Sequence, residues 1–185
     1  MKAAKRERRR LAELVQRRLQ EQSPPPTPQC QPYSCEAANC TPVRIYFGTD
    51  RASQANPDRI SFGPERGGRL RLGHAVVTVP RAVARKRSEI TRPSWFDLRA
   101  LSTPPEGDPN RHFTIPKGGI MLFSDVDDFI FAVQRQQAEE PSAFKDHAFV
   151  FVHGFWTSFD DALYRTARIA YDLGDGTTPF GTAFL

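Results

Sequence analysis

The residues best suited to chemistry are His153, Gly154 and Phe155, which directly follow an apolar run. Residues 148–152 are short, rich in β-branched and aromatic side chains, and lack polar alternation, so they predict a strand buried on both faces of a parallel sheet. Gly154 breaks the run, and Ser158 is a candidate helix N-cap. Backbone N–H groups at a bend between a strand and a helix can hold a negative oxygen, so this stretch predicts half an oxyanion hole.

A helix is predicted to begin after Ser158 and to end near Gly174. Apolar residues at helical spacing follow the cap: Phe159, Leu163, Ala167, Ala170 and Tyr171. Asp160 and Asp161 invite an interpretation as paired catalytic carboxylates. We favour helix-start charges, because the helix dipole stabilises negative side chains in the first turn.

The preceding chain supplies the elements that must position this loop. Residues 43–48 alternate and predict a strand, residues 48–68 predict a polar loop, and residues 70–79 predict a second strand that ends at Pro80. His74 lies inside the second strand, where a structural role is more common than that of a base. The weak pattern of residues 81–111 includes Trp95 and Phe96, which could pack onto the core.

Two short strands are predicted at residues 112–116 and 120–123. A helix follows, with Ser124 as its cap, apolar residues Val126, Phe129, Ile130 and Val133, and an end near Pro141. The order of strand, strand, strand, helix, strand and helix predicts an α/β fold with a mixed sheet that becomes parallel.

Three regions are expected: a basic helical tail at 1–22, a Pro-rich linker at 23–42 and one domain at 43–185. The tail holds eight Lys or Arg and three Glu, so it carries a charge equal to the chain's whole net charge of +5. Its basic face could contact nucleic acid or an anionic membrane surface, but a solvated tail is the more common reading of such a pattern.

The three cysteines, Cys30, Cys35 and Cys40, lie five residues apart. Structural zinc usually needs four ligands in closer pairs, so we expect no metal, and we expect no other cofactor. The odd cysteine count, with no secretory signal and no apolar run long enough for a membrane span, favours reduced thiols and a cytoplasmic protein.

Three separated segments resemble one family in the same order. They are Phe-Val-His-Gly-Phe-x-Thr-Ser-Phe-Asp-Asp-Ala with the helix that follows, Arg-Ile-Tyr-Phe-Gly-Thr-Asp-Arg (44–51) and Leu-Gly-His-Ala-Val-Val-Thr-Val-Pro (72–80). Over residues 43–174 the chain resembles the α/β-hydrolase-like bacterial proteins grouped as a domain of unknown function, DUF900. One departure is Trp156, where the resemblance leads us to expect a small polar residue, usually Asn.

The resemblance implies roles for the loop residues. His153 would shape the loop rather than act as the general base, the Phe155 N–H would be the oxyanion donor, and Gly154 would allow close backbone approach. The substrate class would be small esters or related acyl compounds.

The nucleophile motif of this fold, G-x-S-x-G, occurs nowhere in the 185 residues, so no catalytic residue is assigned. Residues 175–185 contain Gly and Pro interruptions and no long strand pattern. We therefore expect an incomplete, truncated hydrolase-like domain that is inactive alone and would act on an acyl substrate only if a C-terminal half completed it. A frameshift or premature stop after Gly174 would explain both the abrupt end and the loss of family resemblance there. The strand at 148–152 would then be an exposed sheet edge, open to self-association.

The alternative function is that of a non-enzymatic protein that binds an anionic partner through residues 1–22.

Overall fold

The structure is a computed structural model, and it describes residues 39–54, 59–85, 90, 107–140, 144, 147–174 and 179–185. The basic tail at 1–22, residues 23–38 of the linker, Trp95 and Phe96 lie outside these ranges. The predictions made for them are therefore not tested.

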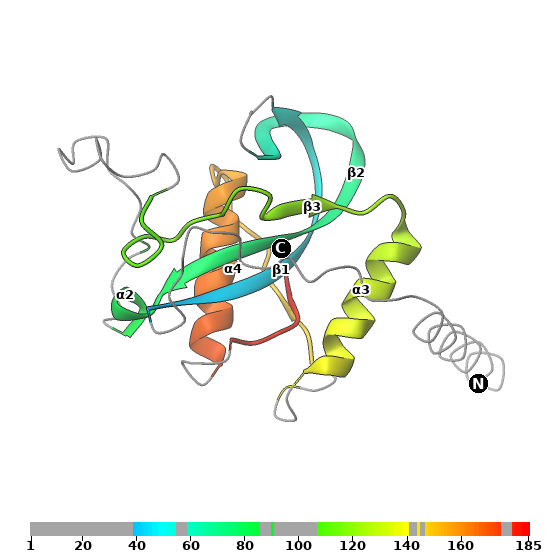
Figure 1. The fold of residues 1–185 in the computed structure, drawn as a ribbon. Coiled ribbons are helices and arrows are strands. Elements are labelled where there is room, and N and C mark those ends of the chain that lie inside the picture. The colour runs from blue at the N-terminus through cyan, green and yellow to red at the C-terminus, as the bar shows by residue number, and fades with distance from the viewer. Residues whose placement is uncertain are drawn as a thin grey trace.

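A long antiparallel hairpin dominates the N-terminal part of the fold (Figure 1). Its strands are β1 (Cys40–Gln54) and β2 (Ser61–Pro80). The prediction of a loop over residues 48–68 was wrong, because the ladder continues through register shifts to the pair Gln54↔Ser61. This outer part, residues 49–54 and 61–69, is called the hairpin arm below. Most of the arm's second strand is exposed, so main-chain pairing rather than apolar alternation forms it.

The sheet has five strands in the order β3-β2-β1-β5-β4. Strand β3 (Ile120–Leu122) is antiparallel to β2, which is followed by the short helix α2 (Arg81–Arg85). Strands β4 (Phe149–Val150) and β5 (Ala183–Phe184) are parallel to each other, and β5 is parallel to β1. The predicted mixed sheet that becomes parallel is confirmed. The strand predicted at 112–116 is reduced to a single bridge between Thr114 and Thr78.

The C-terminal residues form the strand between β1 and β4, which the sequence did not predict. The N–H of Phe149 donates to Thr182 O at 3.0 Å, and the N–H of Leu185 donates to Tyr46 O at 2.8 Å. Glu140 accepts the Gly181 N–H at 2.6 Å, which fixes the approach to β5. A strand of two residues is too short to show a periodicity of its own.

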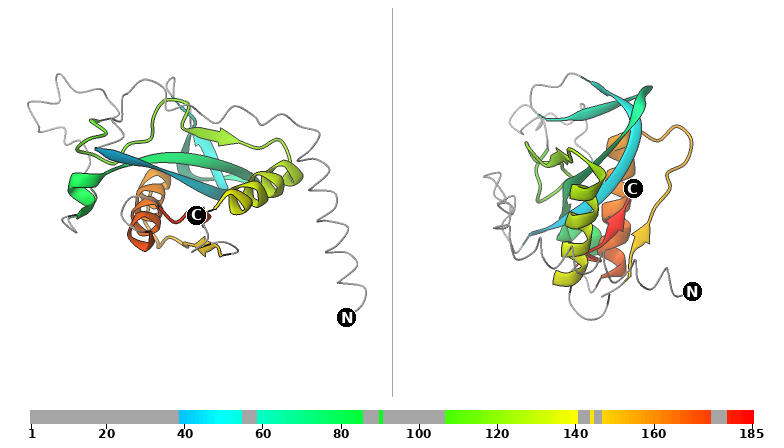
Figure 2. Two further views of the ribbon diagram at one scale, coloured as in Figure 1. Left: turned by 60° about the horizontal axis from the view of Figure 1, so that its bottom comes forward. Right: turned by 90° about the vertical axis from the view of Figure 1, so that its right-hand side faces the viewer.

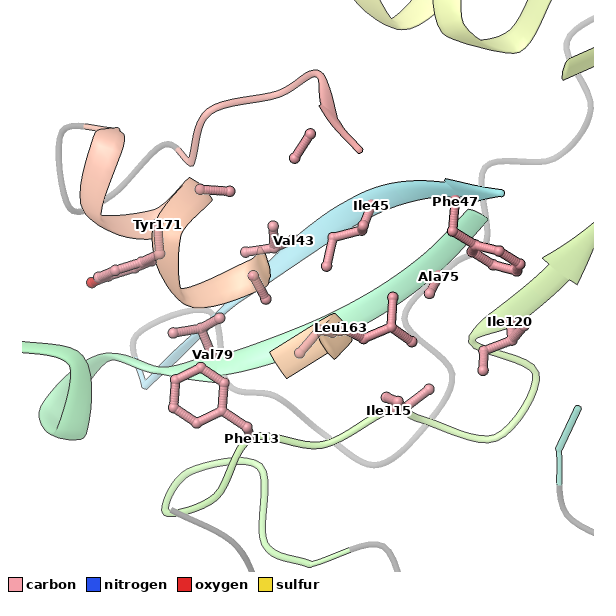
Figure 3. Close-up of a cluster of buried hydrophobic side chains, with 14 of the residues drawn as sticks. Val43, Ile45, Phe47, Ala75, Val79, Phe113, Ile115, Ile120, Leu163 and Tyr171 are labelled. Atoms are coloured by element: carbon pink, nitrogen blue, oxygen red, sulfur yellow. The ribbon is translucent and has the colours of Figure 1, made fainter. Parts of the chain in front are cut away.

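Helix α4 (Phe159–Leu173) covers one face of the sheet, and its buried residues pack on Val43, Ile45 and Phe47 of β1 (Figure 3). Helix α3 (Val126–Glu139) lies against the other face (Figure 2). There the Tyr46 hydroxyl donates to Ala132 O at 2.9 Å. The alternation along β1 therefore sends odd-numbered residues towards α4 and even-numbered residues towards α3.

The helix limits are close to those predicted. Ser158 caps α4, and α4 ends at Gly174, which has φ −75° rather than a left-handed conformation. The cap predicted at Ser124 was one residue off, since Asp125 accepts the Asp128 N–H at 2.8 Å.

The prediction that residues 148–152 are buried on both faces was wrong. Strand β4 is the last strand of the described sheet, and Val150 and Val152 are 65% and 84% exposed. Phe149 packs against the core on the α4 face. Helix α3 contacts Arg44 and Tyr46 of β1, so it leaves the α3 face of β4 uncovered.

The expectation of reduced thiols fails at Cys40, which is disulfide-bonded. Cys30 and Cys35 lie outside the described residues. Strand β1 begins at Cys40, three residues before the predicted start of the domain. Within the described ranges, no helix is long and apolar enough to cross a membrane.

Candidate anion-binding loop

Residues 151–158 connect β4 to α4, so the structure contains the predicted strand, bend and helix in that order. Ser158 holds the start of the helix in two ways. Its Oγ accepts the Asp161 N–H at 3.1 Å, and its carbonyl accepts the Ala162 N–H at 3.0 Å. The bend therefore lies between two fixed points, the β4–β5 pairing and the capped first turn of α4.

His153, Gly154 and Phe155 all line one open pocket of about 740 Å³. His153 Nδ1 lies 3.0 Å from Gly154 O, a contact within the loop itself. Gly154 lines this pocket, and a Cβ on it would meet no atom within 4 Å, so the backbone is open to close approach there. Among the described residues, no backbone N–H of residues 153–157 has a hydrogen-bond acceptor. The main chain of the described residues thus leaves these donors unused.

Trp156 forms the sharpest point of the bend. Its φ is +62°, and within the described ranges it is the only residue other than glycine with a positive φ. Its side chain is 92% exposed, and its ring meets that of Phe155 edge-on, with centroids 5.7 Å apart. The left-handed region is costly for a bulky residue and far less so for Asn, which explains why Asn suits this position.

The opposite wall of the pocket is the hairpin arm, for which the sequence pattern predicts a loop. Arg51 Nη2 donates to Thr157 O at 2.8 Å. Arg59 forms a two-pronged ion pair with Asp160. Because β1 and β4 run parallel to the intervening β5, their carboxyl ends meet at the same edge of the sheet. That topology brings Arg51 to the loop, although about a hundred residues separate them.

Aromatic packing anchors the base of this wall. Phe159, the first residue of α4, lies edge-on to Phe47 and Phe62 with ring centroids 5.0 and 4.7 Å apart. All three side chains are buried. Such pairs add to the stability gained from burial, so the arm and the start of α4 form one packed unit.

The other candidate residues have structural partners. Asp160 pairs with Arg59, and both Asp160 and Asp161 lie in the first turn of α4, as the preference for helix-start charges predicted. His74 lies on the α3 face, between Tyr46 and Phe123, with ring centroids 6.2 and 5.7 Å away. Burial, assisted by the charge of Arg44, lowers the pKa of His74 to about 4. It is neutral at pH 7 and does not line the pocket.

The described residues contain no group of three or more His, Cys, Asp or Glu that could hold a metal ion. Ser158 lines the pocket, but its Oγ accepts a helix N–H.

The fold and the loop define a class of α/β protein with a mixed sheet and an open bend between a parallel strand and a capped helix. Residues 132–183 match the family described as alpha/beta hydrolase of unknown function (DUF900). The chain thus carries a DUF900-type, α/β-hydrolase-like segment, as the resemblance implied. No curated protein and no solved structure matches it significantly.

The match covers the end of α3, then β4, α4 and the start of β5. It continues to residue 183, whereas the resemblance had been placed over residues 43–174. The family resemblance therefore extends beyond Gly174, to residue 183, and the frameshift or premature stop expected there stays a prediction. The match includes the loop 153–155 and leaves out the hairpin arm.

Proposed function

We propose that this chain is an α/β-hydrolase-like protein whose residues 153–155 form the oxyanion half of a serine esterase-type or lipase-type site. The observation that carries the proposal is the loop itself. Its residues line a pocket at the carboxyl end of β4, within the segment that matches the family, and their N–H groups have no acceptor among the described residues.

The proposed roles follow from the geometry of the bend. The Phe155 N–H donates to the oxyanion, Gly154 leaves room for the ligand, and His153 shapes the loop through its contact with Gly154 O. In enzymes that perform acyl transfer, removal of one oxyanion donor costs ~10²–10³ in rate.

We also propose that the chain does not turn over esters by itself. It contains no G-x-S-x-G, and the serine in the pocket caps a helix. In a completed site, a strand bearing the nucleophile would pair with the free edge of β4, next to the loop. The substrate would then be a small ester or related acyl compound.

The test combines anion binding with an activity assay on the full chain. Methylphosphonate, a tetrahedral anion, is titrated while the backbone amide signals of residues 153–157 are followed by NMR. We expect saturable shifts in this loop, and we expect Gly154→Leu, which places a bulky side chain beside these amides, to abolish them without loss of stability. Absence of shifts in the wild-type protein would refute the anion site.

The activity assay uses p-nitrophenyl acetate. We expect no turnover above the buffer rate. Turnover that disappears when one of the chain's own Ser or Cys residues is replaced would overturn the proposed inactivity.

A second candidate function rests on the charge of residues 1–22. This tail would bind an anionic partner, and binding would weaken with salt. Binding of nucleic acid or acidic vesicles that survives deletion of residues 1–22 would contradict it.

A further inference from the structure

Arg51 bridges two walls of the pocket. Its Nη2 donates to Thr157 O in the loop at 2.8 Å, and its Nη1 donates to Gly63 O in the hairpin arm at 3.3 Å. Its own carbonyl accepts a hydrogen bond from Arg71 Nη1 at 2.9 Å. Both ends of the residue are therefore fixed, and both terminal nitrogens of the guanidinium hold main-chain oxygens.

We infer that Arg51 is a positioning residue, through which the hairpin arm fixes the anion-binding loop. Arg51 acts on the loop through the carbonyl of Thr157, the residue after the bend. Two of the five guanidinium N–H donors are used to hold these carbonyls, and we assign Arg51 this positioning role rather than that of an anion ligand.

The bend needs such support because of Trp156. A bulky side chain at φ +62° is strained, and a strained backbone persists only where its surroundings hold it. Trp156 itself is almost fully exposed and gains little from packing. The carbonyl of the next residue, Thr157, is held by the charged and planar guanidinium of Arg51, and among the described residues this is the nearest restraint on the C-terminal side of the bend.

Arginine suits this role and lysine does not. A guanidinium presents several N–H groups in a rigid fork and can hold two carbonyls at once, whereas an ammonium is a compact charge on a flexible stem. Arg51→Lys would therefore keep the charge in the pocket and lose the bridge. This substitution therefore distinguishes two hypotheses: that Arg51 acts through its positive charge, and that it acts by holding the loop in position.

The arm has other attachments, so loss of Arg51 should leave the fold in place. Phe62 of the arm packs on Phe159, and Arg59, which lies just before the arm's second strand, pairs with Asp160. These contacts join the arm to the first turn of α4 and do not involve the bend.

The first measurement needs no ligand. Heteronuclear ¹⁵N–¹H NOEs report backbone motion on the picosecond–nanosecond timescale. In Arg51→Met and Arg51→Lys we expect lower NOEs at residues 154–157 and unchanged values in α4. Arg66→Met is the matched control, because Arg66 lies in the same arm, lines the same pocket and is largely exposed. We expect it to leave the loop unchanged. Unchanged NOEs in a folded Arg51→Met would overturn the inference.

The second measurement is methylphosphonate affinity, and it rests on the proposed function. We expect Arg51→Lys to weaken methylphosphonate binding about tenfold, as much as Arg51→Met does, because both variants lose the charge-assisted hydrogen bonds to the two carbonyls. Retention of wild-type affinity in Arg51→Lys would show that charge alone matters and would overturn the positioning role. If the wild type binds no phosphonate, the proposed function fails, while the NOEs still decide the role of Arg51.

Discussion

At the scale of single residues, the bend at Trp156 favours some residue types over others through its backbone conformation, because the side chain makes little contact with the rest of the protein. The left-handed conformation costs an ordinary residue ~1–2 kcal/mol, and Asn is among the few residues that adopt it readily. The side chain of Trp156 is 92% exposed, so little packing is lost when it is replaced.

We therefore expect Trp156→Asn to raise the free energy of unfolding by about 1 kcal/mol, measured by urea denaturation. Phe155→Asn is the control. It removes the same contact between the two rings, but Phe155 does not have a positive φ. An equal gain in both variants would mean that the removal of an exposed aromatic ring, not backbone relief, is responsible.

His74 makes stability depend on pH. Its Nε2 is buried and has no hydrogen-bond partner among the described residues, and its pKa is lowered to about 4 by burial first and by Arg44 second. The unfolded chain, with a pKa near 6.5, takes up the proton first. The contribution of neutral His74 is thus complete above pH 6.5 and is lost as the pH falls towards 4.

We expect the free energy of unfolding to fall by roughly 3 kcal/mol across this window. In His74→Phe, where an aromatic ring replaces the titrating one, this part of the slope should vanish. Urea unfolding at several pH values measures it. An unchanged slope in His74→Phe would assign the dependence to another group.

At the scale of elements, the unit β4–α4–β5 is closed by a contact between the end of α3 and the start of β5. The buried Glu140 carboxylate accepts the Gly181 N–H at 2.6 Å and the Thr182 hydroxyl at 3.4 Å. A Cβ on Gly181 would lie 1.9 Å from Glu140 Oε2. Any side chain at 181 must displace the carboxylate from both donors.

We expect Gly181→Ala to lower the free energy of unfolding by about 2 kcal/mol, the scale of a lost hydrogen bond to a charged group. Gly154→Ala is the control, because its Cβ would meet open space and its φ is not positive. We expect that change to stay within about 0.5 kcal/mol. Equal effects would indicate a general cost of replacing glycine.

At the scale of the whole molecule, the described sheet ends at β4 with an apolar, uncharged edge. Phe149 and Phe151 direct their N–H groups to β5, so the alternation of the backbone turns those of Val150 and Val152 to the free edge. Both valines are largely exposed. Exposed edges of this composition pair with strands of other chains, and an apolar strand without charges can pair with a second copy of itself.

We propose that the chain self-associates through β4 and expect its apparent mass in light scattering to rise with concentration. Val150→Lys should suppress this rise, since a charge at the edge opposes pairing. Val126→Lys on α3 replaces another exposed apolar residue and should have no such effect. If both variants suppress the rise in mass, the added net charge is responsible. If neither does, the chain does not self-associate through β4.

The sequence by itself determined the strand, bend and helix at residues 148–173, the Ser158 cap and the mixed sheet, because these depend on local periodicity and capping. Only the tertiary structure showed that residues 49–54 and 61–69 form paired strands, since main-chain pairing leaves little trace in polar sequence. It also revealed β5, whose two residues become a strand only between β1 and β4. The contacts of Arg51 with Thr157, Arg59 with Asp160 and Glu140 with Gly181 join residues 41 to 106 positions apart. Such pairs have no local signal, because only the tertiary fold brings residues so far apart in the sequence together. For Arg51 and Thr157 it does so through the parallel order of β1, β5 and β4.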